Sequence, residues 1–251
     1  MDLEKMMQIE WAALNAWPAP RQILYDGWLL RFTGGESKRV NSINVLREST
    51  LPMDEKIRHC EETYARQGLP VIFRLPEHLT SKDLRSALEG AGYIEYDPTY
   101  VLGRCIDIND DLTNGISVRF LSIPEWLQIR SLITGTPMVG LVSHAIVLNL
   151  IVPEKALVAL YSDDRPVACG MGVSEGNLLG FFSIYTRRAE RRRGYGRAVM
   201  AALSQWGAER GATFGYLQVD GDNEPALGMY AHLGFELCYP YVYSKMEKAL
   251  L

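Results

Sequence analysis

The segment Leu178 to Arg197, LLGFFSIYTRRAERRRGYGR, carries an apolar run through an arginine-rich turn directly into a helix-forming stretch. Glycine stands at positions 194 and 196 of the turn. Glycine lets the backbone approach a phosphate closely, the N–H groups of a helix's first turn point outward, and the helix dipole favours negative charge there. The segment therefore predicts a strand, an anion-binding turn suited to pyrophosphate, and a helix.

Two other classes of phosphate-binding turn are disfavoured by the same residues. The segment has no Gly-Lys-Ser/Thr of a P-loop, and it lacks the third glycine and the following acidic residue of a Rossmann turn. Taken by itself, however, a Gly-x-Gly pair also fits an ordinary strand-to-helix turn with solvated arginines. The surrounding elements must decide between the two.

The elements on either side of this segment alternate between strand and helix patterns. We expect the helices at residues 124–133, 142–151, 197–210 and 224–233, and the strands at 116–120, 156–161, 167–173, 178–186, 214–219 and 235–246. Short polar turns separate three successive strands, which predicts an antiparallel meander. Pro240 is expected to bend the last strand because proline donates no ladder hydrogen bond.

The first half of the chain also shows helix and strand patterns. We expect a helix before the Trp17-Pro18 breaker, a hairpin of strands 27–32 and 37–45 turning at Gly34-Gly35, and then a helix, strand, helix and strand at 53–67, 70–75, 81–89 and 93–104. The polar, acidic stretch 107–115 is the best linker candidate. It predicts an N-terminal lobe over residues 1–106 and a second lobe over 116–251.

An internal similarity suggests that the two lobes share one plan. Residues 65–102 resemble residues 208–243, so that Gly68 faces Gly211, Gly92 faces Gly234 and Pro98 faces Pro240. Because glycine commonly follows a helix, some of these matches are expected by chance. The pattern nevertheless predicts one helix, strand, helix, strand unit that is used twice.

Several motifs in the second half resemble the GNAT (GCN5-related N-acetyltransferase) superfamily. Arg191 to Gly196 is similar to its R/Q-x-x-G-x-G/A signature, and the segment from Asn223 through Tyr230 to Gly234-Phe235 is similar to its N-x-x-A-x-x-x-Y-x-x-x-G-F pattern. The resemblance covers about residues 116–246. It implies an α/β acyl-CoA N-acyltransferase fold with a mixed sheet.

The first half resembles the N-terminal lobe of some bacterial members. The similar elements are Gly27-Trp28-Leu29-Leu30-Arg31 and Arg39-Val40-Asn41-Ser42. Residues 46–56 offer no glycine loop where the second copy has Gly194 and Gly196. The resemblance therefore implies two tandem GNAT-like lobes, of which the first is degenerate, and one CoA site in each chain.

The resemblance also implies roles for particular residues. The backbone from Arg192 to Arg197 would hold the CoA pyrophosphate, the strand end would pair with the pantetheine arm and polarise the thioester carbonyl, and Tyr230 would protonate the departing thiolate. Asn223 would bond the cofactor arm or cap a helix. The predicted cofactor-binding residues are Ile184, Tyr185, Thr186, Arg191, Arg192, Arg193, Gly194, Tyr195, Gly196, Arg197 and Asn223. One departure from the family is Arg188, where many members have proline.

The general base is left open by the sequence. Candidates are an ordered water or one of three carboxylates: Glu175, and Asp220 and Asp222 at the end of a predicted strand. Histidine has a suitable ordinary pKa, but His144 and His232 have no evident partner in the sequence. Cys169 and Cys238 are expected to be small buried groups, which favours direct transfer over a covalent acyl-enzyme.

The resemblance implies an N-acetyltransferase that moves an acetyl group from acetyl-CoA to a primary amine of a small-molecule or peptide acceptor. The alternative is a catalytically silent CoA-binding sensor or scaffold. Two tryptophans and two arginines of the first lobe could line an acceptor pocket. Core packing and surface ion pairs explain them equally well. These residues are Trp17, Trp28, Arg31 and Arg39.

Composition narrows the class of partner. A formal net charge of -4 and a pI near 5.7 disfavour nucleic acid and anionic membranes, although a local arginine patch is the rival interpretation of the turn. The four cysteines form no CxxC pair, so we expect reduced thiols and no metal. The acidic N-terminus does not resemble a signal peptide, and the expected location is cytoplasmic, as a monomer or homodimer.

Overall fold

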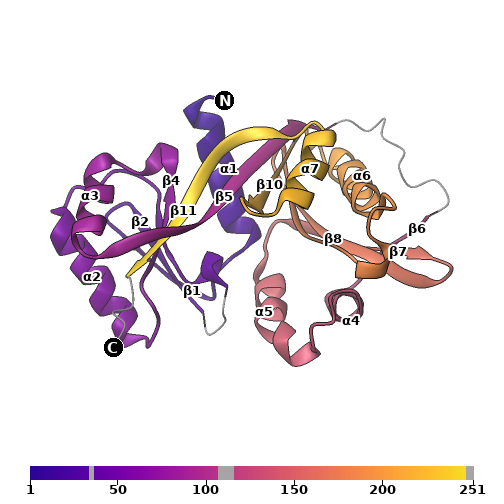
Figure 1. Ribbon diagram of the computed structural model, residues 1–251, viewed down its shortest axis with the longest axis horizontal. Helices are drawn as coiled ribbons and strands as arrows, with labels where there is room; N and C mark the ends of the chain where they lie inside the picture. The colour runs from indigo at the N-terminus through magenta and orange to yellow at the C-terminus, as the bar shows by residue number, and fades with distance from the viewer. Residues whose placement is uncertain (34–36, 107–115, 247–251) are drawn as a thin grey trace. The chain divides into compact units, whose positions relative to one another are not determined.

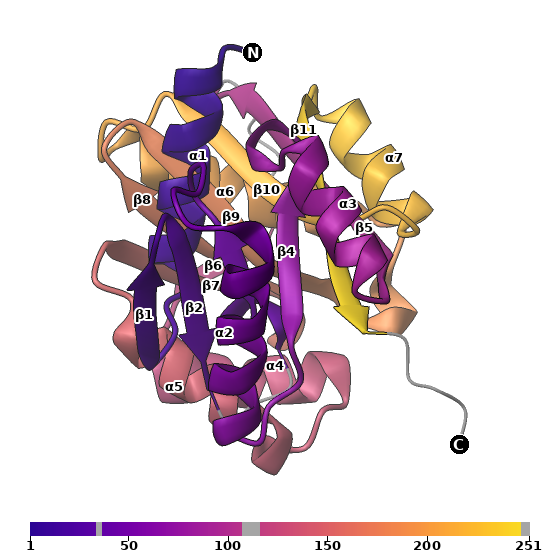
Figure 2. The same ribbon diagram turned by 90° about the vertical axis from the view of Figure 1, so that its left-hand side faces the viewer.

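The computed structural model of the chain describes residues 1–33, 37–106 and 116–246, which form two compact units (Figures 1 and 2). The first unit contains Met1–Pro18, Leu102–Val219 and Glu224–Cys238. The second contains Ala19–Val101, Asp220–Asn223 and the described residues from Tyr239 onward. The predicted linker at 107–115 and the predicted Gly34-Gly35 turn lie outside the described residues.

The first unit is built on a mixed sheet whose strands follow the order β10-β9-β8-β7-β6. Strands β7, β8 and β9 form the predicted antiparallel meander, and β10 runs parallel to β9. The elements are α1 (Leu3–Ala16), β6 (Ser117–Phe120), α4 (Ile123–Thr134), α5 (Val142–Leu150), β7 (Glu154–Ser162), β8 (Arg165–Glu175), β9 (Leu178–Thr186), α6 (Tyr195–Ala208), β10 (Phe214–Asp220) and α7 (Glu224–His232).

Helix α6 and the pair α4 and α5 lie on opposite faces of this sheet (Figure 1). Glycines allow the close packing of α6, because a Cβ atom at Gly170 would lie 2.5 Å from Val199 and one at Gly207 would lie 2.7 Å from Leu179. On the other face, Trp126 of α4 donates its indole N–H to the carbonyls of Val158 and Gly170, each at 3.1 Å. These contacts fix both helix layers against β8.

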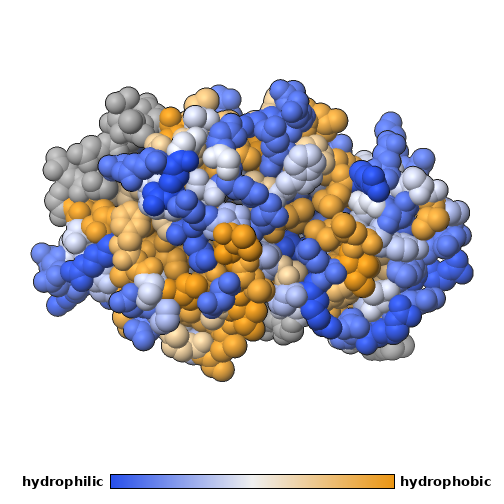
Figure 3. Space-filling view, turned by 180° about the vertical axis from the view of Figure 1, so that it is seen from behind, coloured by the Kyte–Doolittle hydropathy of each residue, from blue (hydrophilic) through white to orange (hydrophobic). Residues whose placement is uncertain are grey.

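The outer side of α5 and of the short 3-10 turn before it remains apolar and exposed. The space-filling view shows hydrophobic side chains gathered on part of the molecular face (Figure 3), and the exposed large apolar residues of this segment are Met138, Val139, Val142, Ile146 and Leu150. Among the described residues, no helix is long and apolar enough to cross a membrane, and no cluster of His, Cys, Asp or Glu could hold a metal ion.

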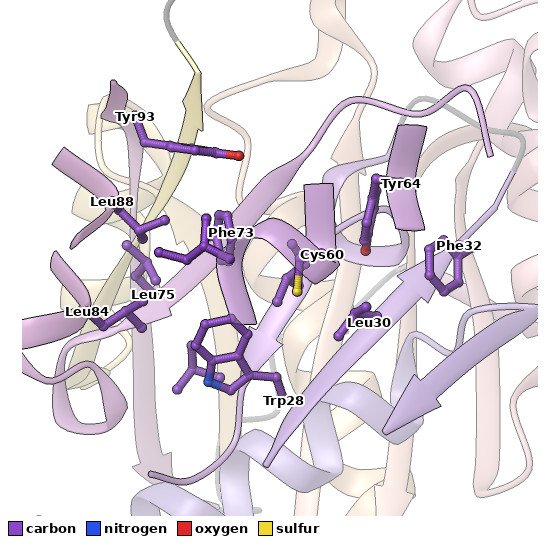
Figure 4. Close-up of a cluster of buried hydrophobic side chains, with 13 residues drawn as sticks. Trp28, Leu30, Phe32, Cys60, Tyr64, Phe73, Leu75, Leu84, Leu88 and Tyr93 are labelled. Atoms are coloured by element: carbon purple, nitrogen blue, oxygen red, sulfur yellow. The ribbon is translucent and has the colours of Figure 1, made fainter. Parts of the chain in front are cut away.

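The second unit has one sheet face covered by two helices. Its elements are β1 (Arg21–Tyr25), β2 (Trp28–Phe32), β3 (Ile43–Val45), α2 (Met53–Arg66), β4 (Ile72–Pro76), α3 (Lys82–Gly90), and parts of β5 (Tyr93–Cys105) and β11 (Glu236–Met246). Figure 4 shows the core, in which Trp28 packs edge to face on Phe73 with ring centroids 5.7 Å apart. The Lys56 ammonium lies 3.8 Å above the centroid of the Trp28 ring and pairs with Asp26.

The predicted hairpin is partly wrong. Strand β2 pairs with β3 as expected, but the hairpin itself joins β1 to β2 through Asp26 and Gly27, whose φ angles are 40° and 82°. Lys38–Val40, predicted as strand, is a 3-10 helix. Asp-Gly with both φ angles positive is a favoured two-residue hairpin turn, and the Asp26-Gly27 pair is the local signal for it.

The predicted internal repeat is confirmed in the order of the elements. The segment α2–β4–α3–β5 corresponds to α6–β10–α7–β11. The four glycines that close the helices, Gly68, Gly92, Gly211 and Gly234, all have positive φ, at 63°, 84°, 84° and 75°. In each copy the first of these glycines donates its N–H to the carbonyl three residues earlier at 3.0 Å.

The repeats exchange their last strands, so the compact units do not follow the predicted division into 1–106 and 116–251. Strand β11, from the second copy, pairs antiparallel with β4 of the first, from Tyr241 opposite Pro76 to Lys245 opposite Ile72. Helix α1 belongs to the first unit, where Trp17 just beyond its end stacks on Phe182 of β9 at 5.9 Å. Sequence continuity does not reveal such an exchange.

The central position of Trp28 predicts a large stability effect. Trp28→Ala should lower the free energy of unfolding by about 3–5 kcal/mol, because it removes a large buried aromatic group and leaves a cavity. The matched control is Trp11→Ala, since Trp11 is 51% exposed, and it should change the value by less than about 0.5 kcal/mol. Urea denaturation followed by circular dichroism measures both, and equal effects would contradict the core assignment.

Candidate functional site

Strands β9 and β10 diverge toward their carboxyl ends. Their parallel register runs from Leu178 opposite Phe214 to Phe181 opposite Leu217, although β9 continues to Thr186 and β10 to Asp220. Beyond Phe181, therefore, the described backbone of β9 is not paired with β10. Open backbone N–H and C=O groups at this place can pair with an extended ligand.

A bulge in β9 lies at the start of this divergence. Met171 pairs with Phe182 and Cys169 with Tyr185, so that Ser183 and Ile184 lie together opposite Gly170. Ser183 has φ 51°, a left-handed conformation that is uncommon for a residue with a side chain. The bulge directs Ile184 toward the α6 face and Tyr185 toward Arg130 of α4.

The turn after β9 ends in an exposed helix N-terminus. Arg187 donates its N–H to Val167 at 2.9 Å, a short 3-10 turn follows at Arg188–Glu190, and Gly194 with φ 83° caps α6. The helix begins at Tyr195, two residues before the predicted start, and its first internal bond runs from Ala198 N–H to the Gly194 carbonyl at 3.0 Å. The N–H groups of Tyr195, Gly196 and Arg197 therefore have no acceptor within the helix.

The two glycines of the turn are required for different reasons. Gly194 faces open space, but its positive φ disfavours any other residue. Gly196 has no such conformation; a Cβ atom there would lie 2.9 Å from the sulfur of Met229 in α7. Gly196 thus allows α7 to pack against the N-terminus of α6.

The arginines of the turn place positive charge around that N-terminus. Arg191, Arg192, Arg193 and Arg197 are exposed, and Arg193 pairs with Glu190 at 2.8 Å. Their exposure leaves them accessible to an anionic ligand. The potential of these side chains adds to that of the helix dipole.

Tyr230 follows Met229 on α7 and is 8% exposed. Its ring meets Phe235 edge on, with centroids 5.8 Å apart, and its hydroxyl makes no hydrogen bond to another described residue. Burial raises the pKa of Tyr230 to about 12. The phenol is therefore protonated at neutral pH and available as a proton donor.

Asn223 lies immediately before α7, is exposed, and donates its backbone N–H to Asp220 at 3.0 Å. Both roles predicted for its side chain stay predictions. Asp220 and Asp222 are also exposed, and Asp220 accepts the Asp222 N–H at 2.9 Å. No carboxylate of the described residues makes a hydrogen bond that would single it out as the base.

The other titratable residues considered from the sequence either contact neighbouring groups or are buried. Glu175 accepts a hydrogen bond from Asn15 at 2.8 Å, and exposed His232 contacts the Gly228 carbonyl at 2.6 Å. Burial raises the thiol pKa of Cys169 to about 12 and that of Cys238 to about 11. Neither thiol is a ready nucleophile, which agrees with direct transfer.

Two residues that the sequence analysis did not select, Arg130 and Trp126, come together with His144 beside the end of β9. Trp126 and Arg130 belong to α4 and His144 belongs to α5, and they lie near Tyr185 of β9. An arginine within the apolar helix sequence IPEWLQIRSLIT was the available signal. The indole of Trp17 meets the His144 ring at 4.9 Å, so one of the four predicted acceptor-pocket residues lies here.

The other three predicted acceptor-pocket residues lie in the second unit. Trp28 is 1% exposed and belongs to the hydrophobic core, as the alternative of core packing predicted. Arg31 is also buried and donates to the Arg39 carbonyl at 3.2 Å. Trp28 therefore cannot wall an open pocket, because its ring is enclosed by apolar side chains.

Solved structures with a similar fold cover nearly the whole chain. A GCN5-related N-acetyltransferase from Kribbella flavida is 16% identical with a TM-score of 0.71, over 98% of this chain and 96% of its own. A tandem GNAT protein from the clavulanic acid biosynthesis pathway is 12% identical with a TM-score of 0.66, over 98% and 97%. At these identities the similarity concerns the fold.

Sequence comparison gives the family. The chain is 25% identical over 238 residues to the protein described as uncharacterized N-acetyltransferase YobR of Bacillus subtilis (strain 168), covering 93% of this chain and 95% of the relative. The model of the family described as probable histone acetyltransferase Rv0428c C-terminal matches residues 5–244. The chain therefore belongs to this acetyltransferase family, within the GNAT superfamily.

Proposed function

We propose that this protein transfers an acetyl group from acetyl-CoA directly to a primary amine of a small-molecule or peptide acceptor. The observation that carries the proposal is the combination, within one compact unit, of a diverging β9–β10 pair and an open α6 N-terminus. Each feature complements one part of CoA. Extended backbone suits the amide-rich pantetheine arm, and free N–H groups suit the pyrophosphate.

The donor is held by backbone and charge. The N–H groups of Tyr195, Gly196 and Arg197 bind the pyrophosphate, and Arg191, Arg192 and Arg193 lend positive potential. Residues Ile184–Thr186 hold the pantetheine arm. A backbone N–H of this strand end polarises the thioester carbonyl and stabilises the oxyanion that forms on it.

The transfer proceeds through one tetrahedral intermediate. The neutral amine attacks the thioester carbonyl carbon, a C–N bond forms, and the carbonyl electrons move to oxygen. On collapse the C–S bond breaks, and Tyr230 donates its proton to the sulfur as the thiolate leaves. The surplus amine proton passes to water or to a base among the acidic groups near the site, and a proton returned by this route restores the Tyr230 phenol.

Replacement of Gly196 by glutamate tests the position of the donor. The new side chain would collide with Met229 and bring negative charge to the pyrophosphate, so acetyl-CoA affinity measured by calorimetry should fall by about 100-fold. Arg191→Glu reverses charge on an exposed side chain without that collision and should weaken binding about tenfold. Gly90→Glu, which meets open space in α3, should leave the affinity unchanged.

Two results would count against this assignment. Absence of acetyl-CoA binding by the unaltered protein would remove the proposed donor. Unchanged affinity in both Gly196→Glu and Arg191→Glu would move the pyrophosphate away from this turn. Binding without turnover on any amine would instead indicate a CoA-binding sensor.

Replacement of Tyr230 by phenylalanine tests the proton donor. The hydroxyl has no described hydrogen bond to lose, so we expect little change in stability and a fall in kcat of about 100-fold. Tyr161→Phe on β7 is the matched control. Because the pKa of Tyr230 is about 12, its acidic form persists as pH rises, and the unaltered enzyme should not lose activity through this group below about pH 10. An unchanged kcat in Tyr230→Phe would exclude the role.

A further inference from the structure

Arg130 lies in the middle of α4 with its guanidinium directed toward β9. Its Nη2 donates to the Tyr185 hydroxyl at 3.3 Å, and the group lies 5.1 Å from the centroid of the Tyr185 ring. The Nε and Nη1 atoms are buried and have no acceptor among the described residues. No described carboxylate forms an ion pair with Arg130, so its charge is not neutralised within this part of the chain.

His144 of α5 provides a second polar group at the same place. Its Nε2 atom is buried without a described hydrogen-bond partner, and its ring stacks on Trp126 with centroids 5.8 Å apart. Burial, together with the nearby Arg130, lowers the pKa of His144 to about 3. The imidazole is therefore neutral at pH 7, and Arg130 carries the positive charge of this cluster.

A guanidinium with two buried nitrogen atoms and no acceptor for them is costly, because the folded chain has removed water from these N–H groups without replacing it. A structural ion pair would offset that cost, and none is present in the described chain around Arg130. A bound anion would offset it equally well. The arrangement thus favours a ligand that brings the missing negative charge.

The position of Tyr185 connects this cluster to the acetyl-transfer site. Tyr185 follows the bulge at Ser183 and belongs to the strand end proposed to hold the pantetheine arm. Its hydroxyl meets Arg130 on the face opposite to α6, so the cationic cluster and the pyrophosphate turn lie on different sides of β9. An acceptor that approaches the thioester from the α4 side would meet Arg130.

We propose that Arg130, with Tyr185 and His144, binds a carboxylate of the acceptor, so that the acceptor class is amino carboxylates, such as amino acids or their close derivatives. This inference rests on the proposed function. A single cation with one phenol and one neutral imidazole matches a monoanion better than a doubly charged phosphate. The aromatic rings of Trp17 and Trp126, which flank His144, suit an apolar part of the same molecule.

Matched pairs of amines test the proposal. The twenty L-amino acids, β-alanine and γ-aminobutyrate are compared with their carboxamides, with acetyl transfer followed through release of the CoA thiol. The best acceptor should be a free acid whose kcat/KM exceeds that of its amide by about 10–100-fold. Arg130→Gln should remove this preference by lowering kcat/KM for the acid while leaving kcat/KM for the amide unchanged. Arg130→Lys should restore part of the preference.

Arg119→Gln is the matched control, because Arg119 on β6 is exposed and pairs with Asp164 at 3.2 Å. It should leave the ratio of acid to amide unchanged. Equal use of acids and amides by the unaltered enzyme would overturn the carboxylate assignment while leaving acetyl transfer intact. Absence of acetyl-CoA binding by the unaltered protein would instead refute the proposed function.

A binding measurement keeps the anion site testable without turnover. N-acetyl-L-phenylalanine and its amide are titrated, with and without CoA, while the ring nitrogen signals of His144 are followed by NMR. A saturable shift caused by the acid, absent with the amide and absent in Arg130→Gln, supports the site. A response to neither compound, or an equal response to both, overturns it.

Discussion

The divergence of β9 from β10 is the constraint on which the rest of the site depends. Paired strands have no backbone groups to offer a ligand, and the register ends at Phe181 and Leu217 while both strands continue. The bulge at Ser183 and Ile184 then alternates the side chains so that Ile184 faces α6 and Tyr185 faces α4. Donor and acceptor groups can therefore reach one strand from opposite faces.

Positive charge occurs in two different physical settings around this strand. The arginines of the turn are exposed and add to the dipole of α6, which suits a ligand whose phosphates stay partly solvated. Arg130 is partly buried, and its buried Nε and Nη1 atoms have no acceptor among the described residues. We propose that the first setting provides affinity for a phosphorylated cofactor and that the second distinguishes an acid from its amide.

The repeated plan of the chain gives the same elements two different uses. Gly68 and Gly211 close equivalent helices with the same hydrogen bond, yet only the second copy carries the glycine turn before its helix. Where the first copy lacks that turn, its sheet face instead packs a core around Trp28 and Phe73. Exchange of the last strands places β11 beside β4, so neither copy completes its sheet with its own residues alone.

Local sequence determined the meander of β7 to β9, the glycine-containing turn before α6 and the repeat, because periodicity, turn residues and glycine positions act over a few residues. It also placed Tyr230 on a helix. The bulge, the exchange of β11 and the meeting of Arg130 with Tyr185 and His144 came only from the tertiary structure. These features depend on register and on contacts between residues distant in the chain, and no local pattern specifies how far two strands remain paired or which helix face meets them.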